Sequence, residues 1–127
     1  MNSFQDEEQL VHNLRRLIKE GGESNFLIVS VGEVYVQFAA SRGDKEMYCE
    51  AVSNEFLPPE LQLAEDKIVQ LQGLDFEEPG ASPNFSRTFD VAEETALREL
   101  AHLTHHILSN VYGCAAQSKL QFELVLQ

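Results

Sequence analysis

The chain has 127 residues, with 21 acidic residues against 9 Lys and Arg and a formal net charge of −12. This length suits a single domain spanning residues 1–127. The negative charge would repel the phosphate backbone of a nucleic acid, which argues against nucleic acid as a partner. No apolar run approaches the roughly 18 residues of a membrane span and no secretory leader is recognisable, so we expect a cytoplasmic protein without a membrane partner. The two cysteines, Cys49 and Cys114, fit a reducing compartment.

The first half of the chain predicts one helix followed by three antiparallel strands. Apolar residues recur at three- and four-residue steps from Phe4 to Ile18, until Gly21 and Gly22 end the helix. Gly32 and Glu33 allow a tight turn between the first two strands, which therefore form a hairpin. The strands are expected at residues 26–31, 34–38 and 46–52.

The second half alternates helices and strands. Pro58 and Pro59 lack backbone donors and end the third strand. A short helix is expected over residues 65–72 with Gly73 as its left-handed stop, then a strand over residues 84–89. Asp90 and Glu93 cap a long helix that ends at Gly113. Four apolar residues then alternate with mostly polar ones in a half-buried last strand: Leu120, Phe122, Leu124 and Leu126.

Three segments together resemble a known signature: residues 50–59 (EAVSNEFLPP), 71–76 (LQGLDF) and 83–87 (PNFSR). In this order and spacing they are similar to the peptide-binding chaperone-like superfamily, which unites type III secretion chaperones, YbjN proteins and stand-alone bacterial TY-Chap domains. The resemblance covers roughly residues 4–126. It implies a type III secretion chaperone-like α+β fold, an antiparallel sheet with packed helices in the order α-β-β-β-α-β-α-β. It also implies peptide or protein binding and a homodimer. The secretion chaperones are usually drawn with two strands before their last helix, and here one of them follows it, which places the chain nearer the YbjN-like branch.

The predicted strands carry apolar residues on both faces, although a sheet covered by helices on one face should be polar on the other. The second apolar face must be covered by helices of this chain, by closure of a half-barrel, by a second copy or by a peptide. We expect a client against one strand face, because aromatic side chains supply most of the energy of such interfaces and a glutamine can bond a peptide backbone. The expected site is Phe26, Ile28, Tyr35, Gln37 and Tyr48. The same face could instead form the dimer.

Catalytic motifs are missing from the sequence: it has no phosphate-binding P-loop, no nucleophile elbow, no H-E-x-x-H and no C-x-x-C. We therefore expect a non-enzymatic peptide- or protein-binding module without a cofactor. The alternative is a small metal-binding or enzymatic domain that uses His102, His105 and His106, since His102 and His106 lie four residues apart on one helical face. A structural or regulatory subunit that only assembles with one partner is a third possibility.

The signature residues have expected structural roles. Asn54 and Asn84 should stabilise turns through side-chain bonds to backbone groups. The aromatic and aliphatic members should fill the seam between the sheet and the middle helix or anchor the fourth strand; they are Phe56, Leu57, Phe76 and Phe85.

Overall fold

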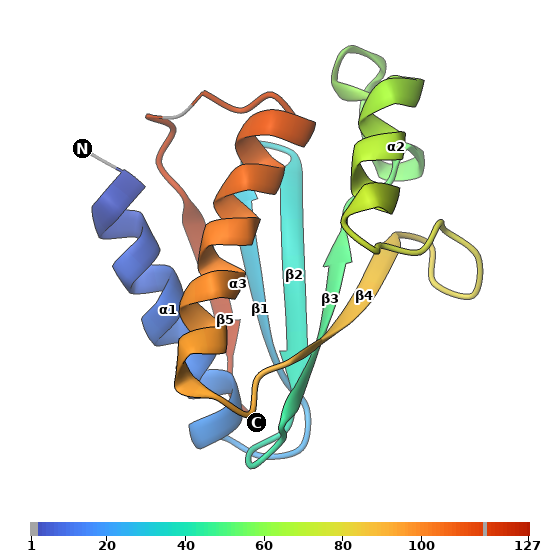
Figure 1. The fold of residues 1–127 in the computed structure, drawn as a ribbon. Helices are drawn as coiled ribbons and strands as arrows, with labels where there is room; N and C mark the ends of the chain where they lie inside the picture. The colour runs from blue at the N-terminus through green and yellow to red at the C-terminus, as the bar shows by residue number, and fades with distance from the viewer. Residues whose placement is uncertain (1–2, 116) are drawn as a thin grey trace.

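The chain folds into one antiparallel sheet with its α-helices on one side (Figure 1). The computed structural model describes residues 3–115 and 117–127. The elements are α1 (Ser3–Lys19), β1 (Asn25–Val31), β2 (Val34–Ala40), β3 (Glu46–Ala51), α2 (Glu65–Gly73), β4 (Phe85–Asp90), α3 (Glu94–His106) and β5 (Gln121–Val125). Two 3₁₀ turns, Asn54–Phe56 and Pro59–Leu61, follow β3, and a π-helical turn, Ile107–Val111, continues α3. The predicted α+β class and the order α-β-β-β-α-β-α-β are confirmed.

The strands lie in the spatial order β4-β3-β2-β1-β5, and every neighbouring pair is antiparallel. Gly32 occupies the turn between β1 and β2 with a φ of +60°, a backbone conformation that glycine adopts without strain. The last strand returns to pair with the first, so Leu124 lies opposite Leu27. Residues from the two ends of the chain therefore share the core, as the alternation in the C-terminal strand predicts.

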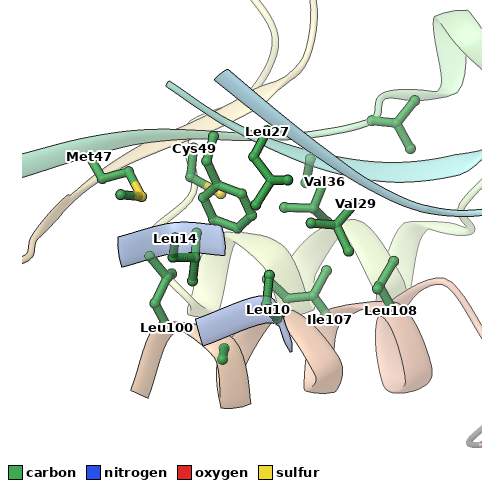
Figure 2. Packing of buried hydrophobic residues seen from close by; sticks show 14 of the residues in the cluster. Leu10, Leu14, Leu27, Val29, Val36, Met47, Cys49, Leu100, Ile107 and Leu108 are labelled. Carbon is green, nitrogen blue, oxygen red and sulfur yellow. The ribbon is translucent and has the colours of Figure 1, made fainter. Parts of the chain in front are cut away.

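The core lies between the sheet and the pair α1 and α3. Side chains on β1, β2 and β3 alternate between buried and more exposed, because successive residues of a strand point to opposite faces. Figure 2 shows the buried side chains of the strands meeting those of the helices and the π-helical turn. The fully buried residues include Leu10, Leu14, Leu27, Val29, Val36, Met47 and Ile107. The helices thus cover one face of the sheet. The sequence also places Phe4 on the apolar face of α1, but its side chain lies outside those that the structure describes.

Asn25 links the end of α1 to the C-terminus of the chain. Its side chain is 1% exposed, and its Nδ2 donates to the carbonyl oxygens of Leu17 at 2.8 Å and Glu20 at 2.9 Å. Its Oδ1 accepts the backbone N–H of Gly22 at 3.1 Å and of Gln127 at 2.9 Å. One buried amide therefore closes the α1–β1 connection and positions the residues that follow β5.

The structure confirms most of the structural roles predicted for the signature residues. The Asn54 side chain donates to the Leu63 carbonyl at 3.0 Å and accepts the Leu63 N–H at 2.7 Å, which closes the proline-containing turn. Asn84 bonds the backbone of Ser53. Three of the apolar signature residues are buried, as predicted: Leu57, Phe76 and Phe85.

Three of the local predictions are wrong. Glu93 occupies the N-cap position of α3 without a side-chain capping bond, and the Asp90 carboxylate accepts the N–H of Ala92 at 2.9 Å, ahead of the helix, so the predicted side-chain cap does not form.

Phe56 is 46% exposed, because the 3₁₀ turn Asn54–Phe56 directs it away from the seam that Leu57 enters. Gly73 is the last residue of α2, but the left-handed residue after this helix is Asp75, with a φ of +68°. The chain thus makes the reversal two residues later than a glycine stop predicts.

Candidate functional site

The face of the sheet opposite the helices carries the candidate site, and we call it the open face. Strand register arranges its side chains in rows that run across neighbouring strands. One row contains Val125, Phe26, Ala39, Tyr48 and Thr88, and the next contains Glu123, Ile28, Gln37, Glu50 and Ser86. No α-helix covers these rows among the described residues (Figure 1).

A depression of about 320 Å³ lies on the open face. Its lining residues are Phe26, Ile28, Gln37, Phe38, Ala39, Tyr48 and Glu50. The structure therefore brings together four of the five residues that the sequence singled out. The fifth, Tyr35, lies on the same face opposite Ser30, where its hydroxyl accepts a hydrogen bond from Asn84 at 3.3 Å.

Apolar side chains form the floor and one side of this depression. Phe26 and Ile28 are half-buried, and Tyr48 is 37% exposed. The protein already buries part of each side chain, and the part that stays exposed is apolar surface that a partner can cover. The open face is thus suited to contact with an apolar side chain of another molecule.

Glu50 forms a polar wall of the depression and is held in place by neutral donors. Its Oε1 accepts hydrogen bonds from the Gln37 Nε2 at 3.1 Å and the Asn84 Nδ2 at 3.0 Å. Its Oε2 accepts one from the Ser82 hydroxyl at 3.1 Å. Among the described residues no Lys, Arg or His forms an ion pair with it. An oriented carboxylate without a counter-ion therefore borders the apolar floor.

Negative charge dominates the rest of the open face. Glu123 lies opposite Ile28, and Glu46 lies opposite Asp90 at the far end of β3 and β4. Along the five strands, all of which the structure describes, the one basic residue is Arg87, which lies on the helix side and donates to the Leu74 carbonyl at 2.7 Å. The open face carries carboxylates and no strand cation.

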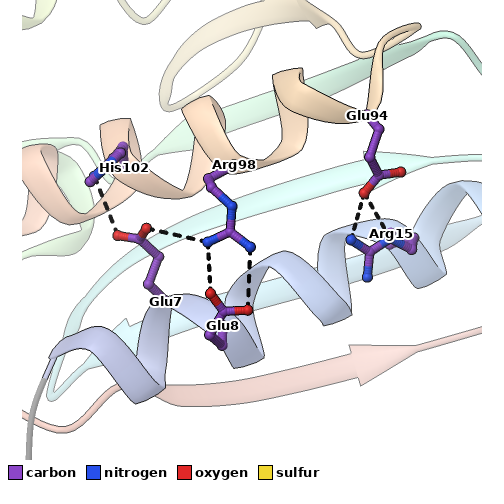
Figure 3. Close-up of polar contacts among 6 residues, drawn as sticks. All are labelled: Glu7, Glu8, Arg15, Glu94, Arg98 and His102. Atoms are coloured by element: carbon purple, nitrogen blue, oxygen red, sulfur yellow. Dashed lines mark hydrogen bonds and ion pairs between the residues drawn. The ribbon is translucent and has the colours of Figure 1, made fainter.

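The outer surface of α1 and α3 is different, because its charges are paired (Figure 3). Arg15 bonds Glu94, and Arg98 donates to the Glu8 Oε2 at 2.8 Å. The hydrogen bond from Arg98 lowers the pKa of Glu8, and that from Arg15 lowers the pKa of Glu94. A depression of about 420 Å³ between these helices is lined largely by such paired groups, so it offers a partner less unmatched charge than the open face does.

The histidines of α3 do not converge. His102 is 73% exposed and its Nδ1 lies 3.3 Å from a Glu7 carboxylate oxygen, whereas the His106 Nδ1 lies 2.8 Å from the Asn110 amide. The His105 Nε2 is buried without a hydrogen-bond partner in the structure as described. No group of three or more His, Cys, Asp or Glu side chains in the described ranges could hold a metal ion.

Both cysteines are free in the structure. Cys49 is 1% exposed in the core, where burial raises the pKa of its thiol. Cys114 is half-buried beyond the π-helical turn, and burial raises its pKa as well. Burial in the folded chain therefore disfavours the charged thiolate form of both cysteines.

Sequence reasoning missed two residues of the site, Glu50 and Asn84. Glu50 lies two residues after Tyr48 in the same strand, so the alternation already places both side chains on one face. No comparable signal exists for Asn84, which lies outside the strands. Its contact with Glu50 depends on the fold of the loop that precedes β4.

Comparison with known families agrees with this architecture. Residues 7–125 match the model of TY-Chap3, described as "T3SS (YopN, CesT) and YbjN peptide-binding chaperone 3". The chain belongs to the TY-Chap3 family. The match spans the sheet, all three α-helices except the start of α1, and every residue of the open face named above. TY-Chap3 membership supports a peptide-binding, chaperone-like role with a protein or peptide client, and it confirms the resemblance inferred from the signature segments.

No curated protein and no solved structure matches the chain significantly. Within the described residues, none of the helices is both long and apolar enough to cross a bilayer.

Proposed function

We propose that this TY-Chap3 protein is a non-enzymatic module that holds a peptide segment of a partner protein on the open face of its sheet. The observation that carries the proposal is the depression of about 320 Å³ on a face that no helix of the described chain covers. Uncovered apolar depressions bordered by polar groups are typical of interaction surfaces. Family membership supports a peptide as the occupant.

Each residue of the proposed site has a distinct role. Phe26 and Ile28 form the floor on which an apolar client side chain packs, and Tyr48 adds an aromatic anchor at the edge. The Gln37 Nε2 is engaged with Glu50, which leaves the amide oxygen of Gln37 to accept a backbone N–H of the client. Tyr35 acts indirectly, since its hydroxyl bonds Asn84, which in turn bonds Glu50.

A second copy of the chain is a poorer occupant of this face than a client. Stacking two open faces would bring Glu46, Glu50 and Glu123 of both copies together without a compensating cation on the strands. Like charges placed together in an interface disfavour it. The homodimer that we expect should therefore use another surface.

A peptide array tests the proposal, with the purified protein applied to immobilised segments of varied sequence. Tyr48→Asp should abolish capture, because it places a charge in the apolar depression, while the circular dichroism spectrum should not change. Val69→Asp on α2 is the matched control, since Val69 is 55% exposed and lies outside the depression. Capture by the Tyr48 variant equal to that of the unchanged protein would remove the site from this face.

A further inference from the structure

The charge pattern of the open face identifies the chemistry of the client, provided that the proposed function holds. We infer that the depression takes an apolar side chain flanked by lysine, and that Glu50 binds the lysine ammonium group. Three observations carry this inference: the hydrogen bonds of Glu50, the absence of a strand cation on the open face, and the position of Glu50 against the apolar floor.

The hydrogen bonds of Glu50 leave one place for an additional donor. A carboxylate offers about four acceptor positions, two on each oxygen. The two donors on Oε1, from Gln37 and Asn84, fill that oxygen, and the hydroxyl of Ser82 takes one position on Oε2. The remaining position on Oε2 accepts a single N–H.

This geometry favours an ammonium over a guanidinium. A bidentate arginine contact needs a vacant position on each carboxylate oxygen, and Oε1 has none. A lysine ammonium is a compact point charge that needs one acceptor and can turn its other hydrogens to water. Glu50 is half-buried, so its charge is screened less than that of a fully exposed carboxylate.

A second carboxylate in the same row of the open face extends the preference for lysine to neighbouring residues of the client. Glu123 lies opposite Ile28, across the depression from Glu50 in the same row. A client that covers the floor therefore lies between two carboxylates, Glu50 at the depression and Glu123 beyond Ile28 on β5, and lysines on either side of its apolar residue would be attracted to both. An acidic client would be repelled from both sides.

The test uses immobilised peptides in which Phe or Leu alternates with lysine, acetyl-lysine or glutamate. We expect the intact protein to bind the lysine series about tenfold more tightly than the acetyl-lysine series, because acetylation removes the charge that Glu50 binds. This comparison changes only the peptide, so it does not depend on the folding of a variant.

Glu50→Gln should then reduce the preference for lysine, with Glu123 left to contribute the remainder, while it preserves binding through the apolar residues. The glutamine is isosteric, its oxygen can accept from Gln37 and Asn84, and its amide can donate to Ser82. Glu99→Gln, an equal change of charge on the exposed surface of α3, is the control and should keep the preference.

The remaining outcomes would overturn the inference in distinguishable ways. Equal binding of the lysine and acetyl-lysine series would refute the lysine assignment and leave the proposed function intact. A lysine preference as large in Glu50→Gln as in the intact protein would assign it to the overall charge of −12 instead of Glu50. Binding of no peptide, or conversion of a dimer to a monomer by Tyr48→Asp, would refute both the inference and the proposed function.

Discussion

The side-chain oxygen of Asn84 accepts the backbone N–H of Ser53 at 3.0 Å, across 31 positions of sequence. Both residues are 3% exposed, so this bond satisfies a donor that water does not reach. The Asn84 amide nitrogen also donates to Glu50. One asparagine therefore joins the turn after β3 to the loop before β4 and orients the carboxylate of the candidate site.

Asn84→Ala should lower the free energy of unfolding by about 1–3 kcal/mol, because it leaves the buried Ser53 N–H without an acceptor. Urea denaturation measures the change. Ser82→Ala is a useful comparison, since it removes a hydroxyl that bonds Glu50 but leaves the bond to Ser53 in place. A midpoint for the Asn84 variant equal to that of the parent would show that the bond contributes nothing.

Phe56→Ala should change the stability by less than about 0.5 kcal/mol, because the side chain is 46% exposed. Phe76→Ala should cost about 3–5 kcal/mol, since Phe76 is 3% exposed and packs edge-on against Phe89 with ring centroids 6.2 Å apart. Thermal melts of the two variants give the comparison directly. Equal losses would contradict the orientation of the 3₁₀ turn.

Tyr112→Phe should lower the stability by about 1–2 kcal/mol at neutral pH, because the Tyr112 hydroxyl donates to the Val52 carbonyl at 2.6 Å. Burial also raises the pKa of Tyr112 in the folded protein above its ordinary value of 10.0. The unfolded chain loses this proton first, so the stabilisation is complete below about pH 10 and declines as the pH rises further.

Denaturation in urea at pH 8 and at pH 10.5 measures this dependence. The variant should lose less stability between the two values than the parent does. The thiol of Cys49, whose pKa is also raised by burial, contributes to the decline in both proteins. An identical decline in parent and variant would place Tyr112 in contact with solvent.

A chain that ends at Gly113 should lose cooperative unfolding, because it lacks β5 and the buried Leu120. The loss would expose β1, which pairs with β5 over five residue pairs, and would remove Phe122 and Leu124 from the core edge. Near-ultraviolet circular dichroism and the sharpness of the urea transition are the measurements. A truncated protein that melts as sharply as the full chain would show that β5 is dispensable.

We expect a homodimer with a mass of about twice 14.3 kDa, measured by light scattering behind a sizing column. Its interface should lie outside the open face, so Tyr48→Asp should leave the mass unchanged. An interface of standard size would bury on the order of 800 Å² per subunit. A mass near 14.3 kDa would contradict the dimer.

Much of the fold follows from local patterns. The alternation in residues 34–38 and the three- and four-residue steps from Leu10 to Ile18 depend only on backbone geometry, so they predicted β2 and α1 well. Phe56 shows the limit of such reasoning. It precedes the buried Leu57, yet it belongs to the 3₁₀ turn Asn54–Phe56, which directs its side chain to solvent. The hydrophobic periodicity of the sequence does not predict that turn.

The candidate site divides in the same way. By itself, the sequence determined which side chains share a strand face, because strand residues two apart always do; Phe26 and Ile28, and likewise Tyr35 and Gln37, are such pairs. The tertiary structure decided that this face is the uncovered one, because α1 and α3 pack on the other side. It also decided that Asn84 meets Glu50, since strand register and loop closure depend on contacts between residues distant in sequence.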